Sequence, residues 1–307
     1  MPRYALLISP RADAAYFAHV LDVARAELMI ESKHIQIGSM QFLIVDTPDA
    51  ELPRLARMSF VQGIFRVDGE HMVPLDVTAN FKLHEDFVWG EKYRGKTNET
   101  LTQLLLNLCL QEHPDAQSLL DPMCGRGTTL FWAMRYGLNA IGIEQDPQAL
   151  ADIRRGVKKW TKLHRVKHAL HEGWVGKANK RGTGKYLDFA ADGQNLRVIT
   201  GDSTDLKPLI QNRTFDILAT DIPYGIQHMG GKERRNPIET LSDATPGWAA
   251  ALKPGGIMAI AFNSYMPKRP ALQEVFTDQG FEVIETQLAH RMSESILRDI
   301  ALFRKLD

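Results

Sequence analysis

The chain has 307 residues, of which 44% are hydrophobic and 24% are charged, and its formal net charge at pH 7 is zero. These proportions are ordinary for a globular enzyme with a sizeable core. The sequence has no apolar stretch of membrane-spanning length, and its first apolar run is too short for a signal peptide. Its two cysteines, Cys109 and Cys124, lie in unrelated contexts, so we expect no disulfide framework and a cytoplasmic protein. We expect no metal site, because no cluster of Cys and His residues has the spacing of zinc ligands.

Residues 1–80 are predicted to form a small α+β domain. Apolar runs predict strands at 4–8, 41–45 and 63–67, and helical spacing of apolar residues predicts helices at 13–30 and 50–58. These elements suggest the β-α-β-β-α-β order of a ferredoxin-like fold. The stretch 74–92 is interpreted as the linker to a second domain, 81–307.

In the second domain strands and helices alternate, which predicts a parallel sheet and the α/β class. Helices are predicted at 97–110, at 128–136 and after Pro147, and strands at 118–120, 140–143, 196–199, 215–219, 257–261, 281–285 and 300–303.

A basic insertion interrupts this alternation at about residues 158–192. From Lys158 to Lys185 the chain carries nine basic residues and one acid, a net charge of +8. A solvated loop and a phosphate-binding surface both explain such a run. Because the chain as a whole is neutral, the concentration of charge favours the phosphate-binding surface. The candidate contacts are Lys177, Lys180 and Arg181 there, and Lys232 and Arg234 in the later run 230–235.

Acidic residues stand at the ends of four predicted strands, namely Asp121, Glu144, Asp202 and Asp221. Ligands of open α/β sheets bind beyond the carboxyl ends of the strands. After Asp121 comes a turn in which Gly125 and Gly127 allow close approach of the backbone to a ligand. The G-x-G-x-x-G fingerprint fails at Leu130, and an acid ahead of the turn would repel a pyrophosphate.

An acidic strand end instead suits a cationic amino acid moiety such as that of S-adenosylmethionine. Glu144 could then accept hydrogen bonds from the ribose hydroxyls, and Asp202 from the adenine amino group. Taken singly, each acid is explained equally well as an exposed strand end or a helix cap. Four such acids together favour the cofactor site, and Met123 and Ser203 are added to the predicted set.

The predicted catalytic loop is Asp221-Ile222-Pro223-Tyr224. An apolar strand here ends in an acid and turns at once. Such a turn can direct a carboxylate, a carbonyl and an aromatic face towards a flat substrate that carries an amino group. Packing beneath a loop is the alternative explanation of Tyr224.

With residues 121–130 and 221–225 in these patterns, the chain resembles class I S-adenosylmethionine-dependent methyltransferases that modify exocyclic or amide nitrogens. Within that class it is most similar to the tRNA guanine-N2 methyltransferases that act on guanosine 10, through residues 92–97, Gly225 and the N-terminal unit. The resemblance implies a Rossmann-like class I methyltransferase sheet, S-adenosylmethionine as cofactor, and guanine N2 in tRNA as the foremost substrate. It also implies that Asp221 and the Ile222 carbonyl accept the two amino N–H groups while Tyr224 stacks on the base. Thr97 lies where the family binds the carboxylate end of the cofactor, although a helix cap is the alternative explanation of this residue.

The chain departs from the family pattern in two places. Ile222 replaces the usual first proline of the catalytic loop, which keeps the carbonyl but not the rigid ring. The interval 74–92 is too short for the RNA-binding THUMP module of the tRNA enzymes. Two alternative substrates stay open: an amino group of adenine or cytosine in DNA, and a glutamine amide in protein. A non-catalytic RNA-binding scaffold is the alternative class of protein. The sequence also leaves open whether a small activating subunit is a partner.

Overall fold

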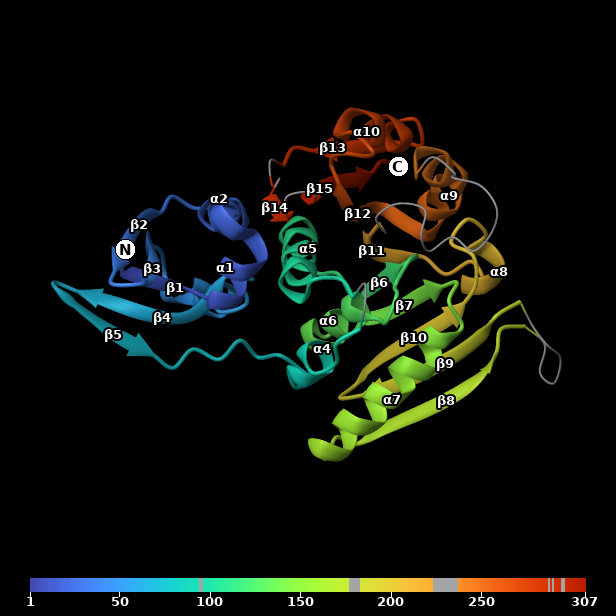
Figure 1. Cartoon of the computed structure of the whole chain (residues 1–307), viewed down its shortest axis with the longest axis horizontal. Helices are drawn as coiled ribbons and strands as arrows, with labels where there is room; N and C mark the ends of the chain where they lie inside the picture. Colours follow the sequence, from blue (N-terminus) through green and yellow to red (C-terminus); the bar gives the residue numbers. More distant parts are fainter. Residues whose placement is uncertain (94–95, 177–182, 223–236, 287, 289, 294–295) are drawn as a thin grey trace. The chain divides into compact units, whose positions relative to one another are not determined.

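The computed structural model describes the chain except for residues 94–95, 177–182, 223–236, 287, 289 and 294–295 (Figure 1). The chain divides into two compact units, the first comprising Met1–Asn80 and Thr286–Asp299, the second Phe81–Glu285 and Ile300–Asp307. The second unit thus differs from the predicted domain 81–307, because Thr286–Asp299 belongs to the first unit. In the described part of the chain, no helix has both the length and the apolar character needed to cross a membrane.

The first unit contains a five-stranded antiparallel sheet with the order β2-β3-β1-β4-β5. Its strands are β1 (Arg3–Ile8), β2 (Lys33–Ile37), β3 (Met40–Asp46), β4 (Val61–Asp68) and β5 (His71–Leu75). The first four follow the split β-α-β arrangement, with β3 between β1 and β2. The predicted ferredoxin-like domain is confirmed, with β5 as an added edge strand.

The predicted helix 13–30 is wrong in one respect, because the structure divides it. Helices α1 (Pro10–Tyr16) and α2 (Val20–Leu28) flank the 3-10 turn η1 (Phe17–His19), where Phe17 has a φ of 48°. Both helices bury apolar side chains, so the helical spacing continues through the break. The predicted helix 50–58 shortens to η2 (Asp49–Glu51) and α3 (Leu52–Leu55).

Strands β2 and β5 were not assigned from the sequence. Both are largely exposed, so they lack the buried apolar alternation that marks β1 and β3. Two-residue turns, 38–39 and 69–70, join them to β3 and β4 as hairpins. The hairpin with β4 therefore places the start of the predicted linker, Pro74, inside a strand.

The second unit contains most of the larger sheet, whose path is β13-β15-β12-β11-β6-β7-β10-β9-β8, with β14 paired to β15. The strands are β6 (Ser118–Asp121), β7 (Asn139–Glu144), β8 (His168–Trp174), β9 (Lys185–Ala191), β10 (Gln194–Thr200), β11 (Phe215–Asp221), β12 (Leu252–Asn263), β13 (Phe281–Ile284), β14 (His290–Ser293) and β15 (Ile296–Lys305). The five parallel strands β10-β7-β6-β11-β12 have the 3-2-1-4-5 order of a doubly wound sheet. The predicted Rossmann-like sheet is confirmed, and its direction of winding reverses between β6 and β11.

Helices bury both faces of this sheet. They are α4 (Asp86–Trp89), α5 (Glu99–Glu112), α6 (Thr128–Tyr136), α7 (Gln148–Leu163), α8 (Lys207–Ile210), α9 (Pro237–Ala251) and α10 (Arg269–Thr277). Leu120 and Leu218 pack in one cluster with Trp248 of α9 and Phe276 of α10. Their neighbours in sequence point to the opposite face, where α5 lies against β11 and β12. Burial on both faces explains why these strands are continuous apolar runs.

The predicted basic insertion has regular secondary structure. Its first residues form the last turns of α7, and the rest contains β8 and β9, a hairpin that pairs antiparallel with β10 at the edge of the sheet (Figure 1). Of the described basic residues, Lys158, Lys159 and Lys162 lie on α7, Arg165 and Lys167 lie in the turn that follows it, and Lys185 begins β9. Lys177, Lys180 and Arg181 fall between β8 and β9, outside the described residues.

One buried carboxylate joins three strands at their amino-terminal ends. Asp216 Oδ2 on β11 accepts the N–H groups of Gln117 and Ser118, both at 3.0 Å, and the Ser118 hydroxyl at 2.7 Å. Its Oδ1 lies 2.7 Å from Nζ of Lys253 on β12. Burial by itself raises the pKa of Asp216, but the bonds from Lys253, Gln117 and Ser118 outweigh it and lower this pKa to about 2.

Asp216→Asn should destabilise the protein near neutral pH by about 2 kcal/mol, because it removes the ionised acceptor of these bonds. The folded-state pKa of about 2 lies below the unfolded value of about 4, so the contribution is complete above pH 4 and decreases as the pH falls towards 2. Urea unfolding at pH 7 and pH 3 measures the difference between wild type and variant. Exposed Asp243 supplies the control, Asp243→Asn. A difference that does not shrink at pH 3 would contradict the assignment.

Candidate active site

The four predicted acids follow strands that run parallel, so they meet at one edge of the sheet. Asp121, Glu144 and Asp221 are the last residues of β6, β7 and β11, and Asp202 lies two residues beyond β10. Asp121 is buried, Glu144 and Asp221 are partly buried, and Asp202 is exposed. The structure therefore brings together the acids that the sequence separates by up to a hundred positions.

The turn between β6 and α6 has the backbone conformation that its glycines permit. Gly125 has a φ of 52° and Gly127 a φ of 81°, in the left-handed region. A Cβ atom built on Gly125 would meet nothing within 4 Å, so the space in front of this turn is open. Met123 donates its N–H to Asp121 Oδ1 at 3.0 Å, which fixes the first step of the turn.

Glu144 is held by the backbone of two loops. Its Oε2 accepts the Gly125 N–H at 2.8 Å, and its Oε1 accepts the Asp146 N–H at 2.9 Å. The two bonds fix the carboxylate between the glycine turn and the segment that leads into α7. A preoriented carboxylate of this kind can accept a pair of neighbouring hydroxyl groups with little further loss of entropy.

Arg126 is a positioning residue that the sequence interpretation did not identify. Its Nη1 lies 2.7 Å from Asp146 Oδ2, and its Nε lies 3.1 Å from Asp152 Oδ2 on α7. These ion pairs tie the glycine turn to the helix that follows β7. A basic side chain inside a glycine-rich turn was the available signal, but its acidic partners are adjacent only in the folded chain.

The electrostatics of this edge favour a cation. Burial, and to a smaller extent the charge of Asp221, raises the pKa of Asp121 to about 7. Asp121 and Asp221 end neighbouring strands, so the negative charge of one makes ionisation of the other less favourable. A positively charged ligand at this edge would be attracted to the ionised form of Asp121.

Other predicted site residues have structural partners. The helix predicted from Thr97 begins at Glu99, and Asn98 caps it by accepting the Leu101 N–H at 3.0 Å, so the predicted start at Thr97 is corrected by two residues. Thr97 is partly buried in the preceding loop. Ser203 is buried, and its carbonyl accepts the Trp248 Nε1–H at 3.0 Å.

Asp202 and Cys124 have distinct environments. Asp202 Oδ1 accepts the N–H of Thr204 at 2.9 Å and its hydroxyl at 2.8 Å, which shapes the loop after β10. Cys124 is buried in the glycine turn, and burial raises its pKa well above the ordinary value. The thiol therefore stays protonated at neutral pH, as expected of a small apolar filler.

The structure describes only the beginning of the predicted catalytic loop. Ile222 is buried, and its N–H donates to the Ala261 carbonyl of β12 at 2.9 Å. Pro223 and Tyr224, together with Lys232 and Arg234, lie outside the described residues. At the same edge β12 ends in Asn263, a polar residue that the sequence interpretation did not single out.

His84, Asp86 and His164 form a polar cluster away from these strand ends. Their ligand atoms lie within 4.8 Å of one another, and Asp86 Oδ2 is 2.8 Å from His164 Nε2. However, the two imidazole rings stack with centroids 3.7 Å apart and an interplanar angle of 20°. One metal ion cannot lie in both of two nearly parallel ring planes, so this arrangement is a hydrogen-bonded cluster.

The pH dependence of stability should reveal the buried Asp121. Its pKa of about 7 lies above the unfolded value of about 4, so the folded protein loses stability from this group as the pH rises through that interval. Asp121→Asn keeps an acceptor for the Met123 N–H and removes the titration. The variant should gain on the order of 3 kcal/mol relative to wild type between pH 5 and pH 8, measured by urea unfolding without added ligand. A constant difference would show that Asp121 is ionised throughout.

Comparison with solved structures finds several methyltransferases with low sequence identity. TrmN from Thermus thermophilus has 17% identity and a TM-score of 0.48, over 90% of this chain and 59% of that one. An S-adenosylmethionine-dependent methyltransferase from Clostridium acetobutylicum has 10% identity and a TM-score of 0.46, over 73% of this chain and 96% of that one. Magnesium protoporphyrin IX methyltransferase from Synechocystis, solved with bound cofactor, has 11% identity and a TM-score of 0.42, over 72% and 88%. The chain thus spans about 59% of the length of the Thermus protein. No curated protein matches the sequence.

A family model gives the decisive comparison. Residues 91–291, more than half of the chain, match the UPF0020 model, described as RMKL-like, methyltransferase domain. The open space before Gly125, the fixed carboxylate of Glu144 and the acidic edge are suited to a cationic nucleoside. S-adenosylmethionine, whose predicted role is confirmed, is therefore the cofactor. The chain belongs to the family of RMKL-like methyltransferase domains and is an S-adenosylmethionine-dependent methyltransferase.

Proposed function

We propose that this enzyme methylates an exocyclic amino group of a base in RNA, foremost guanine N2 in tRNA. The observation that carries the proposal is the position of Asp221. It ends β11 at the reversal point of the sheet, beside the strand whose end leads into the glycine turn, and it begins the catalytic loop. A carboxylate at this point can hold an amino group against a methyl donor bound at the neighbouring strand ends.

Three of the acids would hold the cofactor. Asp121 lies where a cationic amino acid moiety would be attracted, Glu144 would accept ribose hydroxyls and Asp202 the adenine amino group. Thr97, Met123 and Ser203 would complete the pocket around the turn at Gly125 and Gly127. S-adenosylmethionine supplies an electrophilic methyl group on its sulfonium when bound.

Asp221 and Ile222 would position the nitrogen that is methylated. The lone pair of an aromatic amine is delocalised into its ring, so the nitrogen is a weak nucleophile and orientation contributes much of the catalysis. The Asp221 carboxylate would accept one N–H and the Ile222 carbonyl the other. The bond from the Ile222 N–H to Ala261 anchors this residue to β12. As the nitrogen–methyl bond forms, one N–H proton is lost, and Asp221 is the group placed to accept it.

Pro223 and Tyr224 belong to the same proposed catalytic loop, with Tyr224 stacking on the base. Replacement of the first proline by Ile222 keeps the carbonyl on which the proposal depends. The buried Ile222 side chain and its backbone bond to β12 supply constraint that the ring would otherwise provide.

The charge of the described surface favours a nucleic acid over a protein substrate. Among the described residues, four basic side chains after the middle of α7 form no ion pair, namely Lys158, Lys162, Arg165 and Lys167. Unpaired cations on adjoining elements suit a phosphate backbone. Lys177, Lys180, Arg181, Lys232 and Arg234 would extend this surface.

Transfer of label from the radioactive cofactor tests the substrate class directly. The full chain should label the tRNA pool when it is incubated with separate pools of tRNA, rRNA, DNA and protein from cells that lack the gene. Digestion of the labelled tRNA should release N2-methylguanosine. Label confined to DNA or to glutamine in protein would replace the proposal by the corresponding alternative.

Asp221→Ala should lower kcat by on the order of 100-fold or more, because the variant loses both a positioning acceptor and the proton acceptor. Cofactor affinity, measured by isothermal titration, should stay within a few-fold of wild type. The control is Asp278→Ala, which removes an exposed acid after α10 and should leave turnover unchanged. Near wild-type turnover in Asp221→Ala would refute the assigned role.

A further inference from the structure

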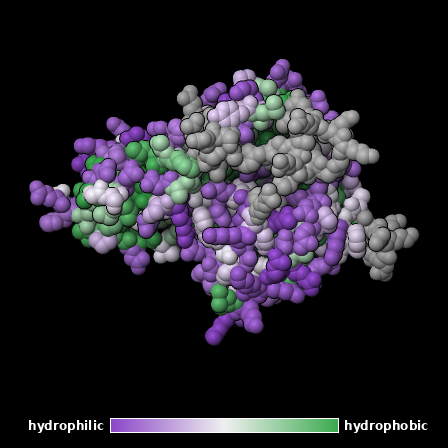
Figure 2. Space-filling view, viewed as in Figure 1, coloured by the Kyte–Doolittle hydropathy of each residue, from purple (hydrophilic) through white to green (hydrophobic). Residues whose placement is uncertain are grey.

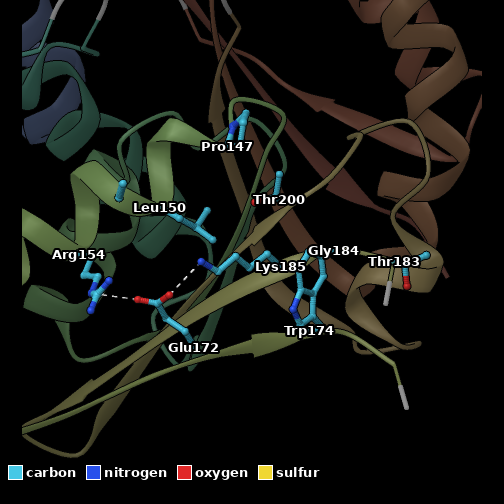
Figure 3. Close-up of a pocket in the computed structure, with 10 residues that line it drawn as sticks. Pro147, Leu150, Arg154, Glu172, Trp174, Thr183, Gly184, Lys185 and Thr200 are labelled. Carbon is cyan, nitrogen blue, oxygen red and sulfur yellow. Dashed lines mark ion pairs between the residues drawn. The ribbon is translucent and has the colours of Figure 1, made fainter. Parts of the chain in front are cut away.

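A second cavity lies between α7 and the hairpin β8–β9, outside the strand-end site (Figure 3). It has a volume of about 360 Å³. Pro147 and Leu150 contribute apolar surface from the start of α7, and Thr200 closes one side at the end of β10. The cavity thus combines an apolar floor with walls from two strands.

Trp174, the last residue of β8, lines this cavity and is unlike the other tryptophans. Its side chain is 46% exposed, and in the described part of the chain it has no hydrogen bond and no aromatic or cationic partner. The other four tryptophans each contact at least one aromatic ring of another residue. A solvated indole ring on a strand is a flat platform with a face available for stacking.

Two basic side chains line the same cavity as the tryptophan. Glu172 on β8 binds Arg154 of α7 through Oε1 at 3.0 Å and Lys185 of β9 through Oε2 at 3.0 Å (Figure 3). One carboxylate therefore holds two cations in place and leaves a net positive charge in the cavity wall. Lys185 is the strand partner of Trp174, and its side chain extends towards Glu172 (Figure 3).

The cavity reaches the edge of the sheet where the four predicted acids lie. Thr200 pairs with Glu144, the acid at the end of β7. Five strand spacings separate β11, which carries Asp221, from β8, which carries Trp174, a distance of about 24 Å across the sheet. A substrate strand of several nucleotides with its target base at Asp221 can extend over this distance to Trp174.

The surroundings indicate the nature of the occupant. Figure 2 shows a predominantly hydrophilic surface over α7 and β8–β10, and two of the unpaired basic residues, Lys158 and Lys162, lie on α7. A protein partner would need a larger apolar patch. An exposed ring beside fixed cations on a polar surface is the combination that binds single-stranded nucleic acid.

We propose that this cavity binds an unstacked base of the substrate RNA on Trp174, with a flanking phosphate at Arg154 and Lys185. The inference rests on the proposed RNA substrate and adds a second contact that positions it. The stacked base would be a neighbour of the methylated one in the folded RNA. Trp174 is accordingly a substrate-binding residue remote from the reacting atoms.

Fluorescence anisotropy of the full chain tests the site with two probes, labelled bulk tRNA and an oligouridylate of roughly 12 nucleotides. Trp174→Ala should raise the Kd for both on the order of ten-fold, whereas Trp174→Phe should retain most of the affinity. In the methylation assay Trp174→Ala should raise KM and leave kcat near wild type. Leu163→Ala, which truncates an exposed apolar side chain at the other end of α7, is the control.

The charged residues have a matched pair of variants. Arg154→Gln and Arg304→Gln each remove a guanidinium bound to one glutamate, but Arg304 pairs with Glu112, outside the cavity lining. Only Arg154→Gln should weaken RNA binding and reduce its salt dependence. Wild-type RNA affinity in Trp174→Ala, with cofactor affinity intact, would overturn this inference alone. A wild-type chain that neither binds nor methylates RNA would remove the proposed function and this inference together.

Discussion

The hydrogen bonds of Asp216 fix the register of the strands whose carboxyl-terminal ends carry Asp121 and Asp221. This carboxylate joins the amino-terminal ends of β6, β11 and β12 through Ser118 and Lys253. Because side chains alternate along a strand, a slip of one residue would turn Asp121 and Asp221 to opposite faces. An ion pair and hydrogen bonds at one end of the strands therefore fix the relative positions of acids at the other end. The low pKa of Asp216 reflects this arrangement.

At the carboxyl-terminal ends of the strands, burial of a carboxyl group has the opposite effect on its ionisation. Asp216 is satisfied by donors, which keeps it ionised, while burial near Asp221 makes ionisation of Asp121 unfavourable. A cationic cofactor bound at the proposed site would supply the missing positive charge, and its binding would then be thermodynamically linked to the ionisation of Asp121. Glu144 is in an intermediate situation, since two backbone N–H groups orient it and leave it partly exposed.

The hairpin β8–β9 broadens the same sheet beyond its parallel core. The pairing of β9 with β10 places the hairpin in the same sheet as the strands that carry the predicted cofactor-binding acids. Trp174 and the pair of cations around Glu172 form the distal part of the proposed RNA-binding surface. Separation of the distal contact from the catalytic loop would allow affinity and chemistry to be altered independently.

Apolar periodicity and strand-end chemistry are local properties, so the alternating elements, the four strand-end acids, the glycine turn and the class of enzyme could all be predicted from the amino-acid sequence alone. It did not reveal β2, the break at Phe17 or the role of Arg126, whose partners Asp146 and Asp152 become neighbours through folding. Only the folded structure shows that Trp174 is exposed in the same cavity as Arg154 and Lys185, and that burial raises the pKa of Asp121 to about 7. Burial and contacts between distant residues set these properties, and neither is encoded by spacing along the chain.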